Sequence, residues 1–151
     1  MKNIFYISLV SLFALNIISC AKDEEHSSTS TTTSDSTTSD NTPELFVTWG
    51  NSGTILTSSD NGTTWDNRTT GTSNHLYGVS YGQSTFVGVG ASGTIITSSD
   101  NGTTWNNRTS GTTVTLWGVT YGNSTFVTVG SSGVILTSSD GTTWENRTSG
   151  T

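Results

Sequence analysis

The segment SSDNGTTW at positions 58–65 decides the fold, because it returns unchanged at 98–105 and, one residue shorter, as SSDGTTW at 138–144. Its aspartates stand at positions 60, 100 and 140, which is a period of 40 residues. A period of this length indicates one supersecondary unit that is repeated along the chain. The repeated part of the chain is therefore one array and not a series of separate domains.

Each unit contains four short strand-like runs separated by glycine turns. In the second copy these runs cover residues 76–82, 84–90, 93–99 and 103–109. They are rich in valine, isoleucine, threonine and aromatic residues, which favour strands, whereas good helix formers are scarce after residue 44. Phe86 alternates with Val87, so both faces of this strand carry apolar side chains. The sequence predicts an all-β fold of stacked sheets.

The pattern Ser-x-Asp-x-Gly-x-Thr-Trp resembles the Asp-box, or bacterial neuraminidase repeat, of β-propeller proteins. The surrounding GVxYG and FVxVG runs are similar to those of photosystem II assembly factor-like propellers. The resemblance implies a hairpin turn between the third and fourth strands of each blade, in which the aspartate accepts amide hydrogen bonds and the tryptophan packs under the turn. The implied structural residues are Ser58, Asp60, Gly62, Thr64, Trp65, Ser98, Asp100, Gly102, Thr104, Trp105, Ser138, Asp140, Gly141, Thr143 and Trp144.

The expected architecture is a partial β-propeller of about three four-stranded blades, at 44–72, 73–112 and 113–151. The first blade is expected to be incomplete, because nothing before Leu45 resembles the run 76–82. Propeller rings have about four to eight blades. An open arc, a homo-oligomer that completes the ring, and a shortened relative of a longer protein all remain open. The core is expected from the repeated aromatics Phe46, Phe86, Phe126, Trp65, Trp105 and Trp144.

The N-terminus has the pattern of an export signal. A lysine at position 2 precedes an apolar run over residues 4–18, so residues 1–19 are predicted to be a signal peptide. The segment IISC that ends at Cys20 resembles a bacterial lipobox, which implies lipidation of Cys20 and a membrane anchor; an ordinary signal peptide is the alternative. Cys20 is the single cysteine. The residue after the cysteine is Ala21 and not aspartate, which resembles the sorting pattern of outer-membrane lipoproteins in proteobacteria.

Residues 20–43 are predicted to be a lipidated cysteine followed by a disordered serine- and threonine-rich linker, since this segment lacks aromatic residues. The predicted location is the bacterial cell envelope, with the folded part on the surface or in the periplasm. Without Lys2, four basic residues stand against eleven acidic ones, a formal charge of −7. This balance, with no basic cluster, argues against nucleic-acid binding.

Catalytic, metal and cofactor sites are not predicted. Sialidases share the Asp-box but need gathered arginines and a tyrosine nucleophile with a glutamate. The arginines at 68, 108 and 147 instead occupy one repeated place, and His26 and His75 have no further ligands at metal spacing. A non-enzymatic protein is expected; a degenerate sialidase-like glycoside hydrolase and a truncated duplicate without its own function are the alternatives.

Candidate binding residues are the aromatic side chains that break the repeat. Trp49 stands where the later copies have valine, and Tyr77 corresponds to Trp117. Aromatic rings outside a structural pattern are frequent binding contacts. Alternatively, Trp49 covers an open edge of the first blade, and Tyr77 and Trp117 belong to the core. The expected role is a non-catalytic binding or assembly module for an unknown protein or glycan.

Overall fold

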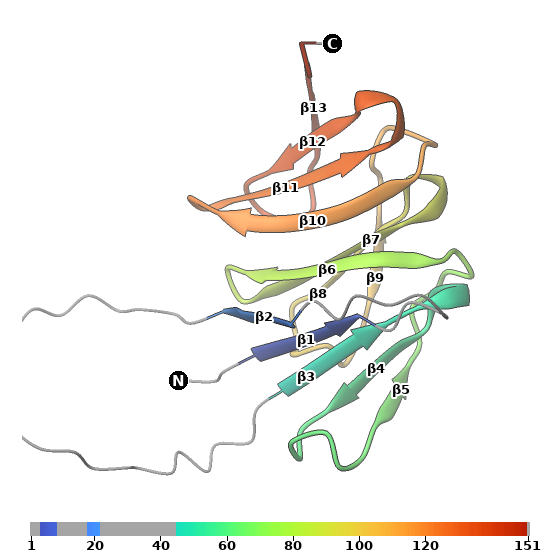
Figure 1. The fold of residues 1–151 in the computed structure, drawn as a ribbon, viewed down its shortest axis with the longest axis vertical. Helices are drawn as coiled ribbons and strands as arrows, with labels where there is room; N and C mark the ends of the chain where they lie inside the picture. Colours follow the sequence, from blue (N-terminus) through green and yellow to red (C-terminus); the bar gives the residue numbers. More distant parts are fainter. Residues whose placement is uncertain (1–3, 9–17, 22–44, 151) are drawn as a thin grey trace, which may run out of the picture.

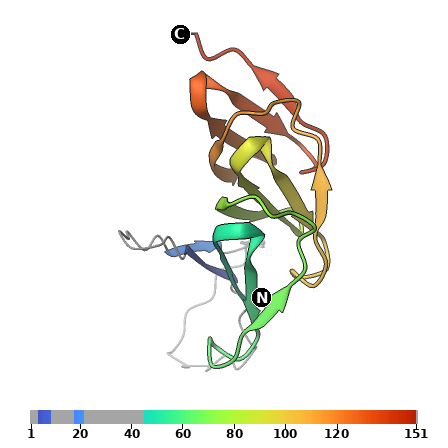
Figure 2. The same cartoon turned by 90° about the vertical axis from the view of Figure 1, so that its right-hand side faces the viewer.

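The computed structural model describes residues 4–8, 18–21 and 45–150, and shows three β-sheets stacked one on another (Figure 1). The sheets follow the sequence order, and a loop leads from the last strand of each sheet to the first strand of the next (Figure 2). The predicted linker over residues 22–43 lies outside the described residues. None of the helical segments in the described ranges has the length or hydropathy of a membrane span.

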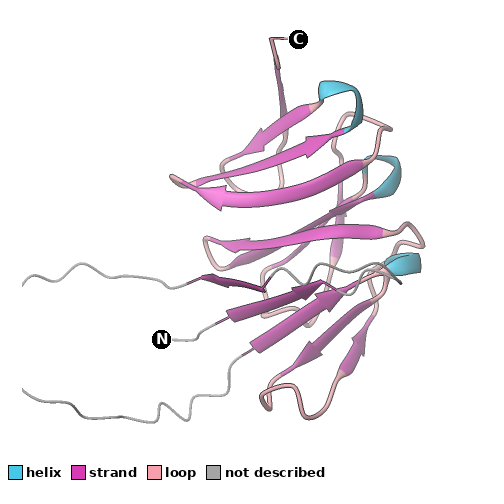
Figure 3. Ribbon diagram, viewed as in Figure 1, coloured by secondary structure: helices cyan, strands magenta, loops and turns pink. Residues whose placement is uncertain are grey.

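The second and third sheets have the same plan, in which four consecutive antiparallel strands lie in sequence order. Their only helical elements are short 3-10 turns, drawn in cyan in Figure 3: η2 (Ala91–Gly93) and η3 (Ser131–Gly133). The strands are β6 (Leu76–Gly82), β7 (Thr85–Gly90), β8 (Ile95–Ser98), β9 (Asn106–Arg108), β10 (Leu116–Gly122), β11 (Thr125–Gly130), β12 (Ile135–Ser138) and β13 (Glu145–Arg147).

The third and fourth strands are shorter than the runs predicted from the sequence. Gly93 was predicted to begin the third run, but its φ of 67°, next to Ser92 with 54°, places it in the η2 corner. The left-handed conformation is tolerated by glycine and is uncommon for serine. Composition alone did not separate this turn from the strand that follows it.

The first sheet differs from the other two at its inner edge. Its own strands are β3 (Leu45–Trp49), β4 (Ile55–Ser58) and β5 (Asp66–Arg68), with η1 (Asn51–Gly53) between the first two. The place of a first strand is taken by β1 (Ile4–Ser8), which pairs with β3 in parallel, whereas β6 and β10 pair antiparallel with the strands that follow them. The fifth strand, β2 (Ile18–Ala21), pairs with β1. Thus the repeat itself supplies three strands of the first sheet.

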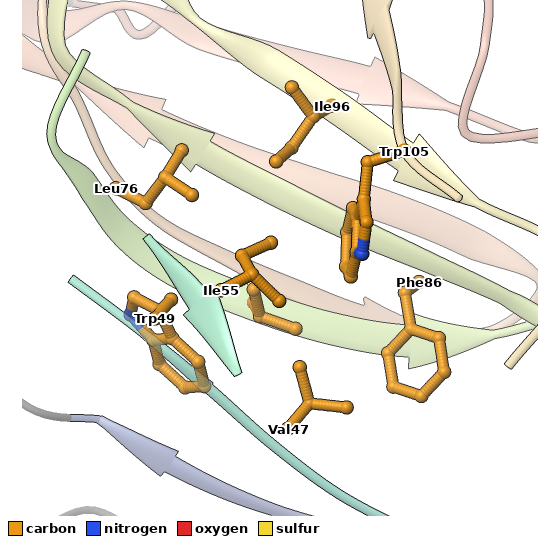
Figure 4. Packing of buried hydrophobic residues seen from close by; sticks show 8 residues of the cluster. Val47, Trp49, Ile55, Leu76, Phe86, Ile96 and Trp105 are labelled. Atoms are coloured by element: carbon orange, nitrogen blue, oxygen red, sulfur yellow. The ribbon is translucent and has the colours of Figure 1, made fainter. Parts of the chain in front are cut away.

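The core lies between neighbouring sheets. Between the first and second sheets, Val47, Trp49 and Ile55 pack against side chains of the second sheet that include Phe86 and Trp105 (Figure 4). Between the second and third sheets, the corresponding cluster consists of Val87, Val89, Ile95, Leu116, Phe126 and Leu136. Phe86 and Val87 thus face opposite neighbours, as the alternation in the sequence predicts.

The prediction of an aromatic core was wrong for the first copy. Phe86 and Phe126 are 0% exposed and Trp105 is 7% exposed, but Phe46 is only half-buried and Trp65 is 37% exposed. Trp144 is partly buried against the second cluster. Among the described residues no sheet precedes the first one, so Trp65 lacks the neighbouring sheet against which Trp105 is buried.

Candidate functional site

The aspartate turns connect the third and fourth strands of each sheet and are held by a repeated set of hydrogen bonds. In the second sheet Ser98 Oγ donates to Asp100 Oδ1 at 2.8 Å and accepts the Gly102 amide at 2.9 Å. Asp100 also accepts the Thr104 amide at 2.9 Å and the Thr104 hydroxyl at 2.7 Å. Trp105 Nε1 donates to the Gly102 carbonyl at 3.0 Å. The first sheet repeats these bonds with Ser58, Asp60, Gly62, Thr64 and Trp65.

The third turn keeps the same roles although it is one residue shorter. Asp140 Oδ1 accepts the amides of Thr142 and Thr143 at 2.7 and 2.8 Å, and Trp144 Nε1 donates to the Gly141 carbonyl at 3.0 Å. The residue that this copy lacks corresponds to Asn101, which has a φ of 56°. The deletion therefore removes a residue in a conformation that non-glycine residues rarely adopt.

The hydrogen bonds of the aspartate turns stabilise the ionised carboxylates. The Thr64 hydroxyl, the Thr64 amide and the Ser58 hydroxyl lower the pKa of Asp60 from 3.8 to about 2. The Thr104 amide and hydroxyl lower the pKa of Asp100 to about 2 as well. The amides of Thr143 and Thr142 hold the pKa of Asp140 still further below its usual range. Each carboxylate is an acceptor for its own turn, and a lowered pKa of this origin is structural in character.

We expect the stability of the protein to fall as the pH drops from about 4 to about 2. The folded aspartates keep their charge down to about 2, whereas unfolded ones take up protons near 3.8, so the unfolded state binds more protons across this window and gains stability there. Thermal melting of the full chain at several pH values checks this. The Asp100→Asn variant should show a shallower decline than the Asp66→Asn variant, and equal declines would contradict the prediction.

An aromatic row crosses the first strands of the second and third sheets. It consists of Tyr77 on β6 and Trp117 on β10, with ring centroids 5.1 Å apart, and His75, whose ring lies 6.4 Å from Tyr77. Trp117 is 55% exposed, Tyr77 is half-buried and His75 is exposed. The interpretation of Trp117 as a core residue is therefore wrong. The structure brings these rings together on the surface.

Polar contacts fix both ends of the aromatic row. Trp117 Nε1 donates to Ser131 Oγ at 3.0 Å, and His75 Nδ1 accepts the Ser52 amide at 3.1 Å. The strands that carry the row lie close together: a Cβ built on Gly78 would lie 3.1 Å from Gly118 Cα. The contribution of His75 was missing from the candidate residues, although the sequence holds a signal for it: His75 stands two positions before Tyr77, at a place where the next copy has Thr115.

Trp49 does not join the aromatic row. It is 7% exposed and belongs to the core cluster between the first and second sheets, on the strand beside β1. Its Nε1 atom is buried without a hydrogen-bond partner among the described residues. The structure thus places Trp49 in the packing and separates it from Tyr77 and Trp117.

The three repeated arginines lie on three different sheets. The Nε atoms of Arg68, Arg108 and Arg147 donate to a threonine hydroxyl on the neighbouring strand of the same sheet, at 2.7, 2.8 and 2.8 Å. Arg68 and Arg147 also pair with Asp66 and Glu145. A sialidase site requires arginines that gather around the carboxylate of the substrate. In this structure the three guanidinium groups are instead held apart on separate sheets.

Two shallow hollows lie beside the loops that connect successive sheets. They have volumes of about 580 and 510 Å³, and both are lined by residues of the repeated Arg-Thr segment and the neighbouring glycine corner. Because they form from corresponding residues of two copies, they are a property of the scaffold. Among the described residues, no three histidine, cysteine, aspartate or glutamate side chains gather in a group that could hold a metal ion.

Comparisons with known proteins support the architecture. No protein-family model matches the chain, and no curated protein matches it. Among solved structures, it is similar to "YCF48 bound to D1 peptide", with a TM-score of 0.56 and 20% identity over 65% of this chain and 35% of that one. It is also similar to YCF48 from Cyanidioschyzon merolae, with a TM-score of 0.58 and 24% identity over 72% of this chain and 34% of that one.

The chain spans about a third of the length of these two structures. YCF48 is a β-propeller, so the likeness and the stacked antiparallel sheets confirm the prediction of an all-β partial propeller. The stacked sheets therefore form blades of a partial propeller, with the aromatic row at the first strands of the second and third blades.

Proposed function

We propose that the protein is a non-catalytic binding module whose aromatic row holds a segment of a partner protein. The observation that carries this proposal is the exposed Trp117 ring, which lies 5.1 Å from Tyr77 and is fixed by its bond to Ser131. A large ring that is held rigidly at the surface loses little entropy when it is covered, and tryptophan and tyrosine are enriched among residues that dominate binding energies.

A protein partner is favoured over a glycan by the likeness to a propeller whose structure contains a bound peptide, "YCF48 bound to D1 peptide". This preference is an analogy between two proteins of the same fold. The separated arginines disfavour the alternative of a degenerate sialidase-like hydrolase. The aspartate turns are, in this proposal, Asp-boxes with a structural role.

The proposal includes export and anchoring at the bacterial envelope. Its basis is the sequence: the apolar run over residues 4–18 and the lipobox-like segment that ends at Cys20. Cleavage before Cys20 would remove β1, so the mature first blade would keep only the strands of the repeat. Several acyl chains on one cysteine would hold the protein stably on a membrane, since a single chain binds only marginally.

Photo-crosslinking in living cells tests the aromatic row as a contact surface. A benzoylphenylalanine is placed at position 117 or at position 77 of the full chain. Both positions are expected to form an adduct with one and the same partner protein, which mass spectrometry identifies. Replacing Trp117 with alanine should weaken co-purification of that partner about 30-fold or more, because truncating such an anchor typically costs about 2 kcal/mol or more of binding free energy.

The control for this experiment is the same photoreactive residue at Thr63, which is exposed in the turn of the first blade. Adducts that are equally abundant from positions 63, 77 and 117 would overturn the proposed surface. An adduct with polysaccharide only would overturn the choice of a protein partner. Unchanged near-ultraviolet dichroism of Trp117→Ala, apart from the lost ring, excludes unfolding as the cause of weaker binding.

The anchor has a separate test. In a bacterial host, the full chain should incorporate an alkyne-tagged fatty acid, and Cys20→Ala should abolish the labelling because Cys20 is the only cysteine. A Ser19→Ala variant, which keeps a small residue before the cysteine, should still be labelled. Labelling that survives in Cys20→Ala would refute the lipobox interpretation.

A further inference from the structure

The two internal interfaces of the arc are built from the same pair of surfaces. In each interface the earlier sheet contributes branched or aromatic side chains, and the later sheet contributes a phenylalanine, an aliphatic residue and a turn tryptophan. In the first interface, Val47, Trp49 and Ile55 of the earlier sheet meet Phe86, Ile96 and Trp105 of the later one. In the second interface, Val87, Val89 and Ile95 meet Phe126, Leu136 and Trp144.

The third sheet presents the earlier surface again, without a cover among the described residues. This surface, here called the C-terminal face, consists of Val127, Val129 and Ile135. Val129 is 48% exposed, and Val127 and Ile135 are partly exposed. Their counterparts in the second sheet are 0%, 0% and 1% exposed. The C-terminal face is therefore one half of an interface that the chain already forms twice.

The first sheet presents the other half. This surface, here called the N-terminal face, consists of Phe46, Leu56 and Trp65. Trp65 is 37% exposed against 7% for Trp105, and Phe46 and Leu56 are partly exposed, whereas Phe86 and Ile96 are 0% exposed.

The space around the glycines of the aspartate turns also differs between the first sheet and the other two. A Cβ built on Gly102 would lie 3.1 Å from Thr57, and one on Gly141 would lie 3.0 Å from Val87, which are both in the preceding sheet. Among the described residues, a Cβ on Gly62 would meet only its own turn tryptophan, at 3.8 Å. The turn of the first sheet thus has room where the other two turns touch an earlier sheet.

We propose that the N-terminal face of one chain binds the C-terminal face of a second copy, so that two chains close a six-bladed ring. The chain itself supplies the template, because each internal interface joins corresponding positions of the repeat. Contact between unlike faces is heterologous and closes into a ring when the rotation allows it. Two copies of the three described sheets give six blades, within the usual range of about four to eight.

Charge does not oppose this contact. Glu145 and Arg147 form an ion pair beside Thr137 and Ile135 on the C-terminal face. In the first sheet, Asp66 and Arg68 form the same kind of ion pair beside Thr57 and Ile55. The surface that contains Ile55 corresponds to the C-terminal face, and it packs against the second sheet. An ion pair at this edge is therefore compatible with stacking.

Native mass spectrometry of the full chain, purified in mild detergent, tests the proposal. The expected mass corresponds to two copies. Val129→Glu on the C-terminal face and Leu56→Glu on the N-terminal face should each weaken association at least about 30-fold, because a buried carboxylate without a partner is strongly unfavourable. Ser73→Glu, at an exposed loop position outside both faces, is the matched control and should remain a dimer.

The decisive measurement is co-expression of the two variants with different affinity tags. Each variant keeps one intact face, so the pair should form a one-to-one heterodimer through a single intact contact, while each alone is a monomer. This outcome also shows that both variants fold. A monomeric wild-type chain would overturn the proposal, as would a mixture without heterodimers. If Leu56→Glu fails to fold, Trp65→Ser takes its place, since Trp65 is already 37% exposed.

Discussion

Gly93→Ala is expected to destabilise the fold by about 3 kcal/mol or more, and the marginal stability of small domains makes loss of the folded state a realistic outcome. Gly93 has a φ of 67°, where an alanine is disfavoured by about 1–2 kcal/mol. Its new Cβ would also lie 2.0 Å from the backbone oxygen of Thr112 and 2.8 Å from Ser110 Oγ. The loop that leads to the third sheet would have to move away.

Gly111→Ala is the matched control for this change. Gly111 has a similar φ of 74°, but a Cβ there would meet nothing within 4 Å. This variant should lose only the conformational contribution of about 1–2 kcal/mol. Urea denaturation of both variants, followed by tryptophan fluorescence, measures the difference. Equal losses of stability would mean that the contact with the Thr112 carbonyl does not constrain the corner.

Phe86→Ala is expected to be comparably harmful, with a loss of about 3–5 kcal/mol. Phe86 is 0% exposed, and its ring lies 4.7 Å from Tyr81 and 6.1 Å from Trp105, between the first and second sheets. Removing the ring leaves a cavity in the middle of the arc, where neighbouring strands cannot collapse without breaking their own pairing. Denaturant unfolding gives the free-energy change.

Phe46→Ala provides the control within the same repeat. Phe46 occupies the corresponding position of the first sheet but is only half-buried, so its removal should cost about half as much. The comparison is best made in the Val129→Glu background, since association of two chains would bury Phe46. A loss for Phe46→Ala equal to that for Phe86→Ala in this monomeric background would contradict the assigned difference in burial.

Much of the fold could be predicted because the residues that form the hairpin turn occur in every copy of the repeat. Asp100, Gly102 and Trp105 recur at the same spacing in the first copy and one residue closer in the third. A short acceptor, a residue able to adopt positive φ and a ring with one donor suffice to specify a hairpin turn. Local chemistry of this kind is independent of the neighbouring sheets. The corner between β7 and β8 was predicted too short, at 91–92, because the pattern of strand-forming residues does not show that β8 begins only at Ile95.

The candidate site could be predicted only in part. Tyr77 and Trp117 were identified as departures from the repeat, but their meeting at 5.1 Å depends on the close approach of β6 and β10 at Gly78 and Gly118. His75 joins them from the loop before β6, through its contact with Tyr77. Trp49 is an equally unusual residue in the sequence, yet it lies in the core. Composition does not distinguish an exposed ring from a buried one when both faces of a strand are apolar.

The sequence by itself determined the all-β class, the repeated unit and the position of each aspartate turn, because these features depend on contacts between residues a few positions apart. Only the tertiary structure decided which copies of a repeated side chain are covered. Phe46 and Phe86 occupy corresponding positions of the repeat, yet of the two only Phe86 is fully buried. The physical reason is that burial depends on the sheet stacked against a side chain, and the first sheet has no described sheet before it.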